Sequence, residues 1–211
     1  MTVAIFPLET VLFPQGIMPL QIFEVRYLDM VQRCHRDNTP FVVSSLTQGQ
    51  EVQRPGEGDG FAPEGFEPVG TLAHVTHLEQ VRAGLLWVVC QGGSRVRIQR
   101  SEKGPLGLWV GEVEALPDDK VVAIPSELSH ISDSLLDVQT QLHRDHPSAI
   151  GISEPLPADA PQWQDAGWVA NRWAEMLPLS SELKQRLLTL DNPLLRLELI
   201  DDQLDDLGLG S

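Results

Sequence analysis

The apolar positions of residues 1–124 come in short runs separated by turn residues, a pattern typical of β-strands. We predict strands at residues 2–6, 9–13, 40–46, 69–78, 85–90, 94–100 and 108–116. Residues 69–78 alternate between apolar and polar, whereas residues 85–90 form a continuous apolar run, as expected of a strand buried on both faces. Many short strands joined by polar turns favour a small barrel or sandwich.

One helix is predicted within this β region, at residues 23–36. Its apolar stripe has helical spacing, so one face should pack on the barrel. The members of the stripe are Phe23, Tyr27, Met30, Val31 and Cys34. Asn38 and Pro40 should end the helix. Residues 47–68 are rich in glycine and proline with little to bury, and we expect a long mobile loop there.

The second half of the chain has helical periodicity instead. Helices are predicted from Pro125 to about His146, at 163–177, and at 182–190 with Ser180 or Ser181 as N-cap. A fourth helix is predicted to open with Asp191 or Asn192 followed by Pro193 in its first turn, and to run through Leu204. A proline-rich linker occupies residues 154–161. The predicted organisation is therefore α+β, with a β domain at residues 1–124 and a helical bundle at residues 125–211.

Charge and composition narrow the possible partners. The net charge is −15. Residues 1–124 hold ten basic and fifteen acidic side chains (−5), and residues 125–211 hold five and fifteen (−10). Nucleic-acid binding relies on Lys and Arg against phosphates, so it is disfavoured. No run reaches the ~18 apolar residues of a membrane span, and the N-terminus lacks a secretory pattern. Two distant cysteines, Cys34 and Cys90, indicate free thiols in a cytoplasmic protein.

Candidate chemistry is sparse. His74 and His77 point to opposite faces of a strand, and His143 and His146 lack further ligands, so no metal or cofactor is predicted. Cys34 beside His35 lies on the apolar stripe, and both cysteines are interpreted as core residues. We expect Asp201, Asp202, Asp205 and Asp206 to form a solvated helix face. Of Trp163, Trp168 and Trp173, at least two should pack between helices, and an exposed one would mark a contact surface.

Five motifs, in order, resemble the N-terminal substrate-binding domain of Lon proteases. The first is the opening, with Phe6-Pro7-Leu8, Leu12-Phe13-Pro14 and the run from Met18 to Tyr27 (MPLQIFEVRY). The next two are Gly70-Thr71-Leu72-Ala73 and the segment 92–98 (GGSRVRI). The last two are Leu177-Pro178-Leu179 and the segment 184–188 (KQRLL). One departure is Gln15, which stands before Gly16 and is expected to lengthen the first turn.

This resemblance implies a PUA-like β pseudobarrel followed by a helical bundle. Lon proteases continue into an ATPase module and a Ser–Lys protease domain. The sequence contains neither a Walker A motif nor protease motifs, so it is similar to Lon N-terminal-like proteins without those domains. The first functional hypothesis is a non-enzymatic module that binds protein or peptide clients. The alternatives are a small hydrolase with its site assembled from distant residues such as His74 or His77, and RNA binding through Arg95, Arg97 and Arg100.

Overall fold

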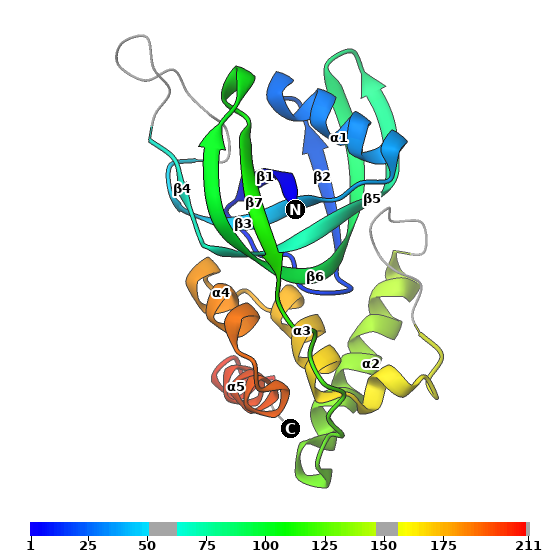
Figure 1. Ribbon diagram of the computed structural model, residues 1–211. Coiled ribbons are helices and arrows are strands. Elements are labelled where there is room, and N and C mark those ends of the chain that lie inside the picture. The colour runs from blue at the N-terminus through cyan, green and yellow to red at the C-terminus, as the bar shows by residue number, and fades with distance from the viewer. Residues whose placement is uncertain (51–62, 147–155, 210–211) are drawn as a thin grey trace. The chain divides into compact units, whose positions relative to one another are not determined.

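The computed structural model describes residues 1–50, 63–146 and 156–209, and it confirms the α+β class. The chain divides into two compact units, Met1–Pro117 and Asp118–Ser211. Among the described residues, the first unit contains the strands and one α-helix, and the second contains four α-helices (Figure 1). The first unit ends at Pro117, before the position at residue 124 where the sequence pattern changes from β to α.

The first unit is a small closed barrel. Neighbouring strands run in the order β1-β7-β6-β5-β3, and a parallel pairing of β1 with β3 closes the ring. Two strands lie off this ring, because β4 pairs with β3 and β2 pairs with β6. The bounds are β1 Thr2–Leu8, β2 Ile17–Ile22, β3 Phe41–Gln48, β4 Gly65–Phe66, β5 Val69–Arg82, β6 Leu85–Lys103 and β7 Trp109–Ala115.

The predicted strand at residues 9–13 is wrong, and β2 was missed. Residues 9–13 have no strand structure, although Val11, Leu12 and Phe13 are buried. These side chains are apolar because they pack in the interior, not because they belong to a strand. The segment is held in place by a hydrogen bond of 2.6 Å that the Leu12 carbonyl accepts from the buried Thr71 hydroxyl. Strand β2 was not predicted because Pro19 lies in its middle, and proline normally argues against a strand. In the structure Pro19 pairs with Val89 of β6. Proline is tolerated in such a strand when its nitrogen faces away from the neighbouring strand.

The turn that leads into β2 packs against the middle of β6. Gly92 donates its N–H to the Gly16 carbonyl, and its own carbonyl accepts from Gln15, both at 2.8 Å. A Cβ at Gly92 would lie 2.1 Å from the Phe13 carbonyl oxygen, so only glycine fits there. Gln15 has φ of 63°, the left-handed conformation that glycine usually supplies. Three of the five motifs therefore meet at this corner of the barrel, through Phe13, Thr71 and Gly92.

The two strands predicted at residues 85–90 and 94–100 are one continuous strand, β6, of 19 residues. Gly92 lies within β6 and does not break the strand. The expected loop at residues 47–68 is shorter at both ends than predicted, because β3 extends to Gln48 and β4 covers Gly65–Phe66. The centre of that predicted loop, residues 51–62, lies outside the described residues.

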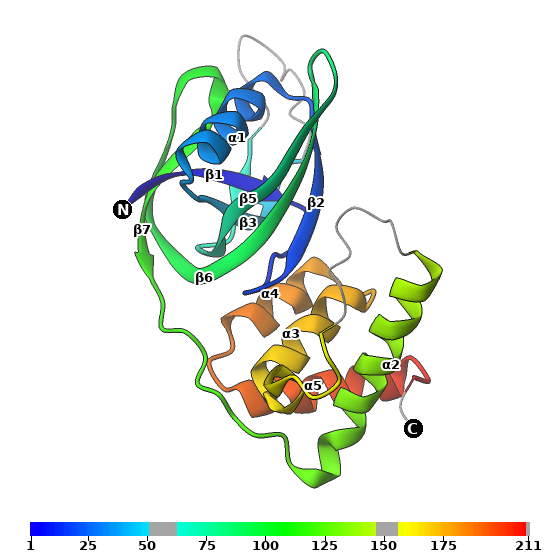
Figure 2. The same ribbon diagram turned by 90° about the vertical axis from the view of Figure 1, so that its right-hand side faces the viewer.

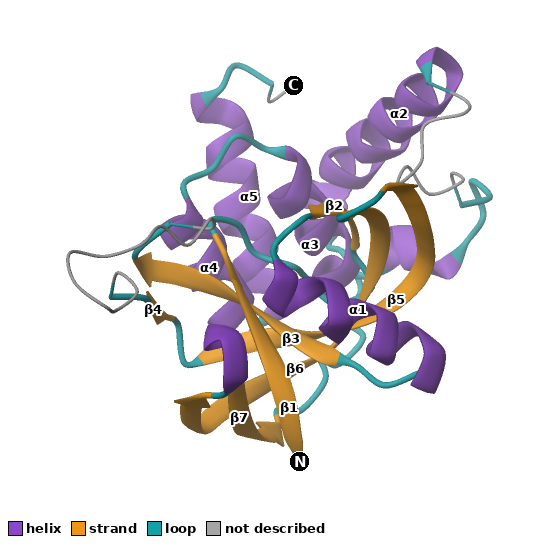
Figure 3. Cartoon of the chain, turned by 90° about the horizontal axis from the view of Figure 1, so that it is seen from above, coloured by secondary structure: helices purple, strands orange, loops and turns teal. Residues whose placement is uncertain are grey.

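Helix α1, Val25–Asp37, packs one face on the barrel as predicted. Figure 3 shows α1 crossing the barrel strands in the view from above. Its buried apolar residues share one core cluster with strand residues such as Phe6 and Val88. The helix ends at Asn38, which is left-handed. Phe23 was wrongly placed on the buried stripe: it precedes the helix and is 51% exposed.

The second unit consists of α2 Ser129–Asp145, α3 Ala166–Met176, α4 Ser181–Thr189 and α5 Pro193–Asp206. The short 3-10 turns of the chain are η1 Pro105–Gly107, η2 Ser126–Leu128 and η3 Pro161–Gln164. Ser180 caps α4, and Asn192 caps α5 ahead of Pro193, in agreement with the predictions. The helix predicted at residues 163–177 begins later because Asp165 caps it, accepting from the Gly167 N–H.

Candidate functional site

A groove beside β2 combines an accessible hollow with apolar walls. Its volume is about 240 Å³. It is lined by residues 19–24, which comprise most of β2 and the following link, and by Phe6, Leu8 and Tyr27 from β1 and α1. We call this surface the β2 groove. Ile22 and Tyr27 are buried at its base, whereas Pro19 and Gln21 are exposed. The groove is smaller than the ~300–1,000 Å³ of typical small-molecule sites, and its size suits a single large side chain.

Exposed apolar side chains lie beside the groove. Phe23 is 51% exposed and lines it, and Val25 at the start of α1 is 67% exposed. Leu106 in η1 is also 67% exposed, and the neighbouring Gly107 carbonyl accepts a 3.1 Å hydrogen bond from Arg26. One end of the barrel unit therefore presents large apolar side chains to solvent, a feature common at protein-binding surfaces.

A buried ionic cluster supports the base of α1. Arg26 and Glu64 have side chains only 3% exposed, and both oxygens of Glu64 accept from the guanidinium at 3.3–3.4 Å. Trp109 Nε1 also donates to Glu64, at 2.7 Å, and Lys103 Nζ lies 3.9 Å away. Because Glu64 is well surrounded by donors, it fixes the direction of Arg26, whose guanidinium lies 4.4 Å from the centre of the Tyr27 ring.

Tyr27 is held tightly but its hydroxyl is not used by the fold. The ring stacks on Phe6 with centroids 3.9 Å apart, and the side chain is 1% exposed. Among the described residues, the Tyr27 hydroxyl has no hydrogen-bond partner. Burial raises the pKa of this hydroxyl, although the nearby Arg26 opposes the shift, so the group remains a neutral donor.

The histidines considered from the sequence do not converge. His77 is half exposed, and its Nε2 lies 3.9 Å from Glu79, which is also exposed. His143 lies in the last turn of α2, and His146 is its C-cap. No group of three or more His, Cys, Asp or Glu that could hold a metal occurs in the described part of the chain. No described helix is long and apolar enough to cross a membrane.

Cys34 and Cys90 are both buried and free, as predicted. Burial raises the pKa of the Cys34 thiol, and it raises that of Cys90 to about 12. A thiol held in the protonated form is a poor nucleophile.

The tryptophans are buried, in agreement with the expectation that at least two are packed, and the aspartate prediction needs one correction, at Asp201. Trp163, Trp168 and Trp173 are all buried, so none of them marks a contact surface. Asp201 was assigned to a solvated face, but its Oδ1 lies 2.9 Å from Nε2 of His130, which ties α5 to α2. The solvated position of Asp201 was predicted from the pattern of α5 alone, which does not show that His130 of α2 lies beside it.

The three arginines proposed as an RNA-binding surface do not form a basic groove. Arg95 is buried and donates to the Pro117 carbonyl. Arg97 and Arg100 are in register with Glu114 and Glu112 of β7. A second hollow, of about 690 Å³, includes Arg100 but also acidic residues of β6 and β7. Among the described residues, neither the hydrolase nor the RNA hypothesis gains a supporting site.

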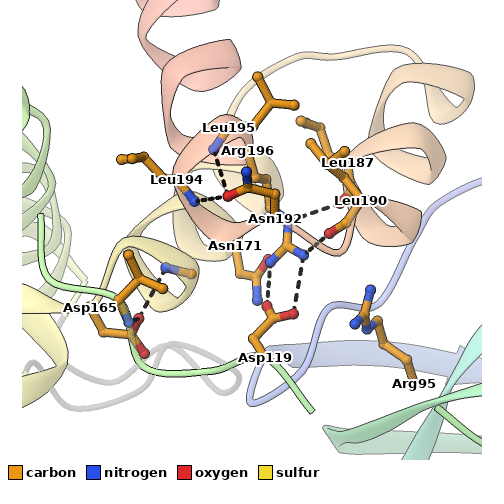
Figure 4. Close-up of polar contacts among 12 residues, drawn as sticks. Arg95, Asp119, Asp165, Asn171, Leu187, Leu190, Asn192, Leu194, Leu195 and Arg196 are labelled. Carbon is orange, nitrogen blue, oxygen red and sulfur yellow. Dashed lines mark hydrogen bonds and ion pairs between the residues drawn. The ribbon is translucent and has the colours of Figure 1, made fainter. Parts of the chain in front are cut away.

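In the helical unit, the side chain of Arg196 is enclosed by polar partners (Figure 4). Nε donates to the Leu187 carbonyl, Nη1 to Asp119 and Asn171, and Nη2 to Asp119 and the Leu190 carbonyl. The residue is 1% exposed. All of its donors are used to join α3, α4 and α5, so this cluster is structural.

Sequence reasoning did not find the β2 groove. The available signal was the MPLQIFE segment, in which Pro19, Gln21 and Phe23 are exposed and Ile22 is buried. That segment was interpreted only as a turn and link between a strand and the helix that follows. The groove forms because Phe6 and Leu8 of β1 lie beside β2 in the fold, a long-range proximity that no local pattern shows.

The barrel, the packed helix and the bundle define a class of small two-part α+β proteins. Residues 2–206 match the family model of the ATP-dependent protease La (LON) substrate-binding domain. The chain therefore belongs to this family, which confirms the resemblance. Curated relatives are the Lon protease of Desulfosudis oleivorans, 26% identical over 97% of this chain, and that of Koribacter versatilis, 26% identical over 93%. The chain spans only 24% and 23% of their lengths.

Solved structures agree with the family. The crystal structure of a Lon N-terminal domain protein from Xanthomonas campestris is 29% identical, with a TM-score of 0.67. The match covers 95% of this chain and 96% of that one. The N-terminal domain of Mycobacterium avium complex Lon protease superposes with a TM-score of 0.61, over 98% and 99% of the two chains. It is 16% identical and supports the fold alone.

Proposed function

We propose that this chain is a non-enzymatic module that binds protein or peptide clients, and that the β2 groove is its contact surface. The observation that carries the proposal is the apolar hollow with the half-exposed Phe23 at its edge. Membership of a substrate-binding family agrees with this role. Burying a Phe side chain at an interface contributes about 1.5–3 kcal/mol, so Phe23 is expected to be a principal contact.

The test is a titration of the purified chain against a chemically unfolded model protein carrying a fluorescent label. We expect saturable binding, and we expect Phe23→Ser to weaken it by about tenfold or more, since 1.4 kcal/mol corresponds to a factor of ten. The matched control is Val121→Ser, because Val121 is 84% exposed and is not among the residues that line the groove. The control should bind as the unmodified protein does.

Phe23→Ser should leave the thermal midpoint nearly unchanged, because Phe23 is already half in solvent. The proposal fails if no unfolded client saturates the protein. It also fails, for this groove, if Phe23→Ser and Val121→Ser bind equally well.

A further inference from the structure

Strand β2 has one edge that pairs with no other strand in the described part of the chain. It pairs with β6 alone, with Ile17 opposite Gln91 and Ile22 opposite Leu86. Figure 2 shows β2 running along one side of the barrel. Exposed strand edges carry unused N–H and C=O groups and are sites where another strand is added. The five strands of the barrel ring, by contrast, are paired on both sides, at least in part.

The register shows which backbone groups point away from β6. The bond from Gly92 N–H to the Gly16 carbonyl identifies this pair as hydrogen-bonded. Bonded and non-bonded pairs alternate in an antiparallel ladder, so Ile17, Pro19 and Gln21 direct their backbone groups outward. Pro19 fits this assignment because it has no N–H to offer β6. Pro19 and Gln21, which carry these outward groups, both line the β2 groove.

The buried Tyr27 hydroxyl is a second unused group at the same place. Tyr27 lines the groove, and its buried hydroxyl has no hydrogen-bond partner among the described residues. Leaving such a group buried without a partner costs about 1–3 kcal/mol, and a fold that tolerates this cost commonly has a use for the group. An acceptor supplied by a bound chain would remove the penalty.

We propose that the β2 groove binds an extended client segment as an added strand on β2, with one large apolar side chain in the hollow and a client carbonyl accepting from Tyr27. This inference rests on the proposed function and specifies its binding mode. In strand addition, main-chain hydrogen bonds supply affinity and a side-chain pocket supplies selectivity. The 240 Å³ hollow supplies one such pocket.

The charge of the protein favours clients with basic residues beside the apolar anchor. Glu24 lines the groove, and the net charge of the chain is −15. A negatively charged protein attracts basic segments, which speeds their association, and it repels acidic ones. A client segment flanked by lysines should therefore bind more tightly than one flanked by glutamates, and added salt should reduce the difference.

The first experiment uses labelled seven-residue peptides with a central phenylalanine and a lysine at each end. The N–H groups of an added strand point alternately toward β2 and away from it. Backbone N-methylation at positions of one parity should therefore weaken binding by about tenfold or more, and methylation at the other parity should leave the affinity within about threefold. Glutamate-ended peptides should bind more weakly than lysine-ended ones at low salt.

The second experiment alters the protein. Gln21→Pro removes an outward N–H without touching the bonds to β6, and Gln21→Ala is its matched control. We expect Gln21→Pro to bind severalfold more weakly than Gln21→Ala, which loses the same side chain but keeps the outward N–H. Tyr27→Phe should also weaken peptide binding severalfold, while its thermal midpoint stays equal or rises because a buried unpaired hydroxyl is gone. A purely structural Tyr27 hydroxyl would instead lower the midpoint.

The outcomes separate this inference from the proposed function. If the unfolded client binds and depends on Phe23, but methylation parity has no effect on the peptides, strand addition is refuted and the binding function stands. If neither client nor peptide binds, both are refuted. A stable dimer of the free protein that Gln21→Pro abolishes would overturn the inference as well, because a second copy of this chain would then occupy the edge.

Discussion

Arg26 in the barrel unit and Arg196 in the helical unit are both buried, but their surroundings differ. Every donor of Arg196 has an acceptor within the helical unit (Figure 4). The Nε of Arg26 forms an ion pair with Glu24 at 3.3 Å but no hydrogen bond, and the adjacent Tyr27 hydroxyl has no hydrogen-bond partner among the described residues. A fully satisfied polar cluster specifies a fold, whereas unused groups beside an accessible groove are suited to binding.

The largest expected loss of stability comes from removing the Arg196 side chain from its cluster of acceptors. Arg196→Met removes the guanidinium that donates to Asp119, to Asn171 and to the Leu187 and Leu190 carbonyls. Removing one partner of a buried ion pair costs about 3–5 kcal/mol. We expect hydrogen exchange to show loss of protection in α3, α4 and α5, with protection of the barrel strands kept.

The matched control for this change is Arg186→Met, because Arg186 is exposed on α4. Its effect should stay within about 0.5 kcal/mol, as for most surface substitutions. If Arg196→Met were no more destabilising than Arg186→Met, the structural role of the cluster would be wrong.

The corresponding change in the barrel unit is Arg26→Met, and we expect a smaller cost of about 2 kcal/mol. Glu64 would retain the indole N–H of Trp109 at 2.7 Å and the Lys103 ammonium at 3.9 Å, so it would not be left without donors. The measurement is the free energy of unfolding from hydrogen exchange of the barrel strands. Arg33→Met on the exposed face of α1 serves as control. A cost equal to that of Arg196→Met would remove the distinction between the two clusters.

Much of the fold was predictable because local patterns determine it. The caps Ser180 and Asn192 satisfy backbone N–H groups two or three residues away, so they are visible in the sequence. The buried stripe of α1 follows from its 3.6-residue period, with Tyr27, Met30 and Cys34 all buried. The family motifs added the closed barrel, which periodicity alone did not distinguish from a sandwich.

The errors arise where contacts between distant segments override local pattern. Residues 11–13 look like a strand because they are buried, yet they are fixed by Thr71 and pack against Gly92. Strand β2 contains a proline and forms only because β6 lies beside it. Phe23 has helical spacing but lies before the helix and beside the groove. The candidate site consists mainly of these misassigned positions, since binding surfaces expose residues that folding alone would bury.

The smallest predicted change in stability is that at Glu175. Its carboxylate belongs to the helical unit, but its negative charge is compensated incompletely there. Burial raises its pKa from 4.5 to about 7, although Arg172 Nη2 lies 2.7 Å away and opposes the shift. Because the folded-state pKa lies above the unfolded value, the associated stability is fully present below about pH 4.5 and is lost as the pH rises through about 7.

Glu175→Gln removes this titration, so the stability of the variant relative to the unmodified protein should increase between pH 5 and pH 8. We expect a change on the order of 1 kcal/mol, since the side chain is 23% exposed and solvent weakens the effect. Urea unfolding at the two pH values measures it, with Glu182→Gln on the exposed side of α4 as control. If the stability difference for Glu175→Gln is the same at both pH values, Glu175 is ionised throughout, and its pairing with Arg172 is as complete as that of Asp119 with Arg196.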